Sequence, residues 1–140
     1  MTTIRSALLA LITLNLALYC AAEGIEVFRW EHRVLMVFAQ ADQLETLTAQ
    51  LDALEEEVLD RHVLWFIVDG DKLNSNYNGP ISPGFAGQIA KRYHTNETDN
   101  LQVVLVGKDG GVKYSAEKLQ SEIIFATIDR MPMRQEEMSR

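Results

Sequence analysis

The stretch that decides the fold is Arg33-Val34-Leu35-Met36-Val37-Phe38-Ala39. From Val34 onward its apolar residues form an unbroken run of strand length, without the alternation that leaves one face of a strand in water. A strand of this kind is covered on both faces and is typical of the middle of an α/β sheet. The residues that follow, Gln40 and Asp42, lead into a helix at the position where α/β proteins often keep their functional site.

Helical and strand patterns continue from this run in a regular order. Leucine and valine at helical spacing predict one amphipathic helix of roughly four or five turns, with Asp42 and Glu45 forming a capping box at its start. A second apolar strand is predicted over residues 63–68, parallel to the first and joined to it by a right-handed crossover. Residues 69–84 are predicted as a long polar loop, 85–93 as a short helix and 101–106 as a third strand.

The remainder of the chain predicts a hairpin and a final helix. Lys108-Asp109-Gly110-Gly111 forms a tight turn whose glycines permit positive φ, so the next segment should return antiparallel to the third strand. Ser121 is expected to cap the last helix and Pro132 to end it. The resulting order, β-α-β-α-β-β-α with a four-stranded mixed sheet, is that of the minimal thioredoxin fold.

The first 22 residues are expected to be a signal peptide, followed by one domain over residues 23–140. After Arg5 comes an apolar run that is too short for a comfortable membrane span of about 20 residues. The run ends in the small residues that a signal peptidase recognises, with cleavage expected after Ala22. An uncleaved anchor is the alternative. Export would place the protein in the periplasm of a bacterium or outside a eukaryotic cell.

Charge and cysteine content exclude several classes of function. Without Arg5 the chain has 12 basic and 20 acidic residues, a net charge of −8, which disfavours nucleic acids and anionic membrane surfaces as partners. The chain contains one cysteine, Cys20, which would leave with the signal peptide. The mature protein would then have no thiol for redox chemistry or metal binding.

Three motifs resemble a known family: the segment 106–113 with its double glycine, the segment 128–134 with Pro132, and Trp30 with Arg33 at the front. The chain is similar over residues 28–138 to a domain-of-unknown-function family of bacterial exported proteins, related to a domain of vertebrate sushi-repeat extracellular proteins. The resemblance implies a thioredoxin-like or peroxiredoxin-like fold and an exported location. It implies no established reaction.

The residues that define the thioredoxin redox site are missing. At the position of the Cys-x-x-Cys pair the chain has Ala39-Gln40-Ala41-Asp42, and in the region of the cis-proline it has Asp99-Asn100-Leu101. The segment 69–74 lacks the fifth-position oxygen ligand and the glycine of a calcium loop. His32, His62 and His94 are not spaced as metal ligands. No catalytic residue, metal or cofactor is therefore expected.

Two candidate binding sites remain, and both are hypotheses. We expect Arg33, Lys108, Lys113 and Arg134 to gather at one end of the sheet, either as an anion- or partner-binding patch or as structural ion pairs with Asp109, Asp129 or Glu137. The alternative ligand site at the opposite end comprises Gln40, Asp42, Asp69 and Asp71. The leading interpretation is a non-catalytic, exported binding or interaction module with an unknown protein or small-molecule partner. The alternative is a small-ligand-binding protein or a non-thiol enzyme.

Overall fold

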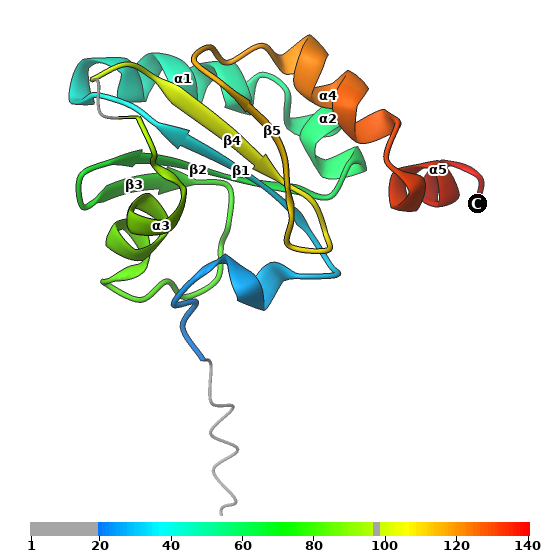
Figure 1. Cartoon of the computed structure of the whole chain (residues 1–140), viewed down its shortest axis with the longest axis horizontal. Helices are drawn as coiled ribbons and strands as arrows, with labels where there is room; N and C mark the ends of the chain where they lie inside the picture. The colour runs from blue at the N-terminus through cyan, green and yellow to red at the C-terminus, as the bar shows by residue number, and fades with distance from the viewer. Residues whose placement is uncertain (1–19, 97–98) are drawn as a thin grey trace, which may run out of the picture.

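The computed structural model describes residues 20–96 and 99–140, so most of the expected signal peptide lies outside the described residues (Figure 1). Its strands are β1 (Arg33–Phe38), β2 (Val63–Asp69), β3 (Lys72–Ser75), β4 (Gln102–Val106) and β5 (Val112–Ala116). Its α-helices are α1 (Leu44–Asp52), α2 (Glu55–Asp60), α3 (Phe85–Tyr93), α4 (Ser121–Asp129) and α5 (Pro132–Met138). Short 3₁₀ helices, η1 (Ile25–Phe28) and η2 (Ala41–Gln43), precede β1 and α1.

The strands form one mixed sheet in the order β3-β2-β1-β4-β5, with β1 in the centre as expected. β1 pairs with β2 in parallel and with β4 antiparallel. The turn between β4 and β5 has Gly110 at φ 86°, and β5 returns antiparallel to β4, as its glycines predicted. The carboxyl ends of the parallel strands β1 and β2 therefore lie at the same end of the sheet, where β4 begins.

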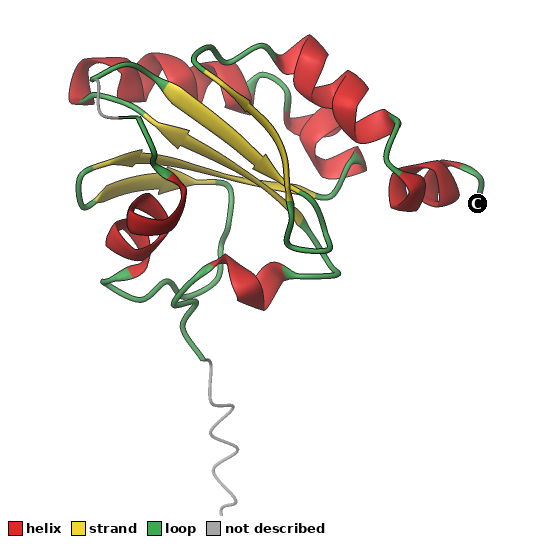
Figure 2. Cartoon of the chain, viewed as in Figure 1, coloured by secondary structure: helices red, strands yellow, loops and turns green. Residues whose placement is uncertain are grey.

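Both faces of the sheet are covered, which explains why the central strands show no polar alternation (Figure 2). On one face, Met36 and Phe66 pack with η1 and with Phe85 and Ile89 of α3. On the other face, Val37 and Ile67 pack in a second apolar cluster with residues of α1, α2 and α4. All six residues of β1 are buried, including Arg33.

The sheet has five strands rather than the four expected. The additional strand, β3, lies inside the segment 69–84 that was predicted as a loop, and it pairs antiparallel with β2. Gly70 at φ 58° makes the reversal between the two strands. Because β3 is a short edge strand with one paired side, its sequence needs no apolar run, and its polar composition concealed it.

The helices depart from the expected pattern at three places. The first long helix is divided into α1 and α2 at Leu54, whose φ of −108° and ψ of 23° are not helical. Its capping box is formed by Gln40 and Gln43 rather than by Asp42 and Glu45. Pro132 follows the end of α4 but also begins α5, because proline fits the first position of a helix, where no N–H is needed.

The chain before η1 is paired with the loop that precedes α3. Ala22 forms a parallel bridge with Ile81, in which the Ala22 N–H donates to Pro80 O and the Ser82 N–H donates to Ala22 O, both at 2.9 Å. The side chain of Ala22 is buried within the apolar cluster on the α3 face. In the described part of the chain, no helix has the length and apolar character needed to cross a membrane.

Candidate functional site

The two ends of the parallel strand pair hold the two groups of candidate residues. Gln40 follows the carboxyl end of β1 and Asp69 ends β2, whereas Arg33 begins β1 at the opposite end. Lys108 lies in the turn after β4, which runs antiparallel to β1, so it lies at the Arg33 end. The described structure thus separates Lys108 and Arg33 from Gln40 along the length of the sheet.

The carboxyl ends of β1 and β2 border a cavity of about 310 Å³, here called the carboxyl-end pocket. Its polar side chains come from separate segments of the chain: Gln40, Asp69, His94, Asp99 and Asn100. Gln40 Nε2 donates a hydrogen bond to the backbone oxygen of Asp99 at 3.1 Å. The imidazole of His94 stacks on the ring of Phe38, with centroids 4.8 Å apart, so the pocket also has a flat aromatic wall.

Two of the four residues expected at this end do not line the pocket. Asp42 is an exposed residue of η2, and Asp71 is exposed in the turn between β2 and β3. The structure therefore brings Gln40 and Asp69 to one cavity but leaves Asp42 and Asp71 outside its lining. No arginine or lysine is among the described lining residues, so the charged groups that face this pocket are carboxylates.

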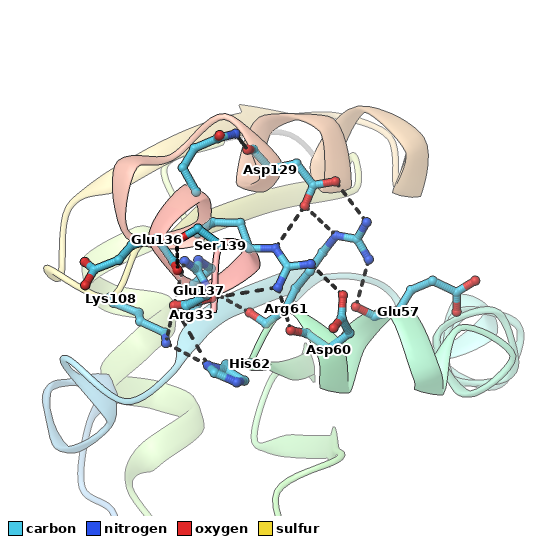
Figure 3. Close-up of polar contacts among 12 residues, drawn as sticks. Arg33, Glu57, Asp60, Arg61, His62, Lys108, Asp129, Glu136, Glu137 and Ser139 are labelled. Carbon is cyan, nitrogen blue, oxygen red and sulfur yellow. Dashed lines mark hydrogen bonds and ion pairs between the residues drawn. The ribbon is translucent and has the colours of Figure 1, made fainter.

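The opposite end is organised around Glu137 of α5 (Figure 3). Arg33 donates to both oxygens of this carboxylate, from Nη1 to Oε2 at 3.1 Å and from Nη2 to Oε1 at 3.3 Å. Lys108 Nζ donates to Oε1 at 2.6 Å and lies 2.7 Å from His62 Nδ1. Arg33 also donates from Nη1 to Arg61 O at 2.8 Å.

A second carboxylate centre adjoins the first. Asp129 accepts hydrogen bonds from Arg61, at 3.0 and 2.9 Å, and from Arg134 Nε at 3.2 Å. Arg134 also donates to the Asp60 side chain at 2.5 Å and to the Asp60 backbone oxygen at 2.8 Å. We refer to these groups together as the ion-pair cluster, which comprises Arg33, Asp60, Arg61, Lys108, Asp129, Arg134 and Glu137.

The predicted basic residues are therefore brought together but are not presented to solvent. Arg33, Lys108 and Arg134 are 1%, 7% and 5% exposed. Lys113, the fourth, lies outside the ion-pair cluster and pairs with Asp109 at 2.8 Å. Three buried cations that already contact carboxylates are held in place as part of the fold, which is the structural role considered for them from the sequence.

The electrostatics of this end follow from those contacts. Burial raises the pKa of Glu137, but the hydrogen bonds from Lys108 and Arg33 outweigh it and hold the pKa below its ordinary value. The hydrogen bond from Arg61, and more weakly that from Arg134, lowers the pKa of Asp129. Both carboxyl groups are thus ionised at neutral pH. Burial lowers the pKa of the nearby His32, whose Nδ1 has no hydrogen-bond partner among the described residues.

Several residues of the two sites could not be found by spacing alone. His94 and Asp99 reach the carboxyl-end pocket from the segment after α3, whose sequence carries no ligand-binding motif. Arg61 and His62 follow α2, directly before β2, and their position at the Arg33 end follows from the strand order. The described residues contain no group of three or more His, Cys, Asp or Glu side chains arranged to hold a metal ion.

Comparison with solved structures supports the fold. The chain is similar to the reduced 2-Cys peroxiredoxin of Plasmodium vivax, with a TM-score of 0.56 and 18% sequence identity. The match covers 79% of this chain and 70% of the peroxiredoxin chain. The fold is therefore α/β with a mixed sheet of the thioredoxin-like, peroxiredoxin type. At this level of identity the likeness concerns the fold alone.

Comparison of sequences identifies the family. No curated protein matches this chain. A family model described as "Domain of unknown function (DUF4174)" matches residues 25–137, which span η1 to the end of the ion-pair cluster. Since that match extends over most of the sequence, the chain belongs to the DUF4174 family of domains of unknown function.

Proposed function

We propose that the protein is an exported, non-catalytic binding module on a thioredoxin-like scaffold, and that its ligand is a small organic cation held in the carboxyl-end pocket. The single observation that carries the proposal is the pocket itself, where Asp69 and Asp99 face a cavity that no described cation lines. Ligands of open α/β sheets commonly bind at this edge. We also propose that the protein is related to bacterial exported proteins and to a domain of vertebrate sushi-repeat extracellular proteins, as its sequence motifs suggest.

The geometry favours this pocket over the basic residues as the principal binding site. Arg33, Lys108 and Arg134 are buried and contact carboxylates, so a partner reaching them would have to replace existing ion pairs. In contrast, neither Asp69 nor Asp99 forms an ion pair with another described residue. Phe38 and His94 provide an aromatic wall against which an apolar or aromatic part of the ligand can pack.

Thiol chemistry has no support in this site. The one cysteine of the sequence, Cys20, is exposed and is not among the residues that line the pocket. A peroxidatic or dithiol mechanism requires a thiolate at the reacting position, and Gln40-Ala41-Asp42 occupies the start of the helix that follows β1. We expect purified protein to reduce neither insulin disulfides nor peroxide, and peroxide turnover by metal-free protein would contradict this part of the proposal.

The proposed ligand class can be tested with three probes of one shape and different charge. We expect 2-phenylethylamine to bind saturably, as followed by the amide resonances of residues around Gln40 and Asp69. Phenylacetate and 2-phenylethanol, which keep the ring but lack the cation, should bind at least about tenfold more weakly, because a charged hydrogen bond contributes roughly 1.5–3 kcal/mol.

A matched pair of variants assigns the binding to the pocket. Asp69→Asn removes a carboxylate that lines the cavity, whereas Asp71→Asn makes the same change at an exposed turn residue outside it. We expect the amine affinity to fall about tenfold or more in Asp69→Asn and to stay unchanged in Asp71→Asn. Equal affinities for amine and carboxylate, or equal losses in the two variants, would refute the proposed site.

A further inference from the structure

The contacts around Glu137 have the form of a binding site for a carboxylate. Arg33 donates hydrogen bonds to both oxygens of the Glu137 carboxylate in a bidentate arrangement, and Lys108 donates a third charged hydrogen bond to one of them. Arginine in this fork geometry is the side chain that proteins use most often to recognise carboxylates. The two cations come from β1 and from the turn after β4, whereas the carboxylate comes from a separate element, α5.

The ion-pair cluster contains one more cation than it contains carboxylates. Its members are four cations, Arg33, Arg61, Lys108 and Arg134, against three carboxylates, Asp60, Asp129 and Glu137. The cluster therefore carries one net positive charge within a chain whose net charge is −7. The buried Nε of Arg33 also has no hydrogen-bond partner among the described residues, although Arg33 is 1% exposed. Buried N–H groups without a partner are uncommon in folded proteins.

A cavity of about 180 Å³ lies beside these two cations. Arg33 and Lys108 are in its lining, together with Gly107 and the paired Lys113 and Asp109. The apolar part of the wall is formed by Met131, Pro132 and Met133 at the junction of α4 and α5. An apolar cavity of about 150 Å³ is large enough for benzene, so this one has room for a chain of about six carbons. The site thus combines a cation pair with an apolar compartment of limited size.

The helix that carries Glu137 is held mainly by charge. Of its seven residues, Arg134 alone is buried, while Met133 and Met138 are 39% and 48% exposed. Figure 1 shows α5 at the margin of the molecule, beyond the end of α4. A short helix that buries no apolar side chain has little to anchor it apart from its ion pairs. A competing carboxylate can therefore replace Glu137 without disrupting either apolar cluster.

We infer that Arg33 and Lys108 form a second binding site, for a small monocarboxylate with a short apolar chain, and that Glu137 is an internal carboxylate which occupies this site until the ligand displaces it. The ligand carboxylate takes the position of the Glu137 carboxylate between the two cations, and its apolar chain enters the cavity beside Met131 and Met133. Displacement loosens the end of α5 around Glu137, while the ion pairs of Arg134 with Asp60 and Asp129 keep the first turn of the helix, with Pro132 and Met133, in place. This site is independent of the carboxyl-end pocket, which lies at the other end of the strands.

The wild-type protein provides the first test, with hexanoate as the probe and 1-hexanol as the control of equal chain length without charge. Hexanoate should shift the amide resonances of Lys108 and of the turn at residues 107–111 in a saturable manner, and 1-hexanol should not. Hydrogen exchange of the α5 amides should become faster when hexanoate is bound. The absence of a saturable, hexanoate-specific shift in this turn overturns the inference, as does exchange in α5 that is unchanged or slower.

Two neighbouring substitutions provide the second test. Glu137→Ala removes the internal competitor, so its affinity for hexanoate should be at least about tenfold higher than that of the wild type. Glu136→Ala removes the same charge from the adjacent residue of α5, which is exposed and pairs with Arg140, and its affinity should equal that of the wild type. Equal affinities in the two variants overturn the inference. If Glu137→Ala does not fold, the exchange of α5 in the wild type decides the question.

Discussion

The two ends of the central strand pair use charged side chains in opposite ways. At the carboxyl end, Asp69 and Asp99 face an open pocket and pair with no described cation. At the amino end, Arg33 and Lys108 are buried, and the carboxylate of Glu137 lies between them. Charge at the first end has no described counter-ion, whereas charge at the second end attaches the last helix to the sheet. The comparison predicts that substitutions at the two ends differ mainly in their effect on stability.

The largest difference is expected between Glu137→Gln and Asp69→Asn, which remove one negative charge each and keep the shape of the side chain. Glu137→Gln leaves Arg33 and Lys108 buried without a countercharge, so the free energy of unfolding should fall by about 2–4 kcal/mol. Asp69→Asn should change it by less than about 0.5 kcal/mol. Chemical denaturation of both variants measures the difference. Equal losses would mean that the two ends do not differ in this respect.

Acid should reduce the stability that the amino end contributes, and this loss should develop gradually as the pH falls. Because the folded protein lowers the pKa of Glu137 and Asp129 below their ordinary values of 4.5 and 3.8, their contribution to stability is complete above those values. It is lost as the pH falls through the lower values of the folded state. Burial also lowers the pKa of His32 below 6.5, so a separate loss should begin below pH 6.5, where the unfolded chain takes up the proton.

Unfolding measured from pH 7 to pH 3 distinguishes these contributions. In Glu137→Gln the loss of stability below pH 4.5 should be smaller than in the wild type, because one of the responsible carboxyl groups is gone. In Asp69→Asn it should be the same as in the wild type. An identical acid response in Glu137→Gln and in the wild type would show that Glu137 does not govern the acid sensitivity of this end.

A smaller effect is expected where neutral hydrogen bonds, rather than charges, hold the chain. A protein that begins at Ala21 keeps the Ala22 bridge to Pro80 and Ser82, whereas one that begins at Glu23 loses both hydrogen bonds and the burial of Ala22. We expect the shorter chain to be less stable by about 1–2 kcal/mol. Thermal unfolding of the two chains measures this, and mass spectrometry of the protein isolated from its source identifies its N-terminal residue. Equal stabilities would show that the bridge is dispensable.

The smallest effect concerns the backbone just before β1. Trp30 is 58% exposed and has a φ of 72°, a conformation that glycine adopts at lower cost than tryptophan. Trp30→Gly should raise the free energy of unfolding by about 0–1 kcal/mol, after the entropic cost of glycine is subtracted. Val27→Gly, at a similarly exposed residue without positive φ, should lower it. A clear loss of stability in Trp30→Gly would show that its side chain contributes to packing or binding.

The central part of the fold could be predicted because its signals are local. The apolar runs of β1, β2 and β4 and the glycine turn before β5 each determine a feature within a few residues. The edge strand β3 escaped prediction because pairing on one side requires no apolar pattern. The helix α5 is not predicted by the sequence pattern, because proline signals the end of a helix as readily as its first position, where Pro132 lies.

The candidate sites were predictable to the extent that strand direction determines them. The order and direction of the strands put Gln40 and Asp69 at one end of the sheet, and Arg33 and Lys108 at the other. Burial was not predictable in the same way. An isolated arginine at the start of a strand has the same sequence signature whether it faces water or, like Arg33, is buried against a carboxylate, Glu137, that lies 104 residues further along the chain.

That separation along the chain has a consequence for the time at which the domain can complete its fold. Glu137 leaves the ribosome after every strand has been made, and until then Arg33 and Lys108 have no carboxylate from α5 to neutralise them. Burying two cations without a countercharge is costly, so a nascent chain that ends before α5 should keep this end of the sheet open. The final helix thus sets the order of events: synthesis of every strand comes first, and closure of this end of the domain comes last.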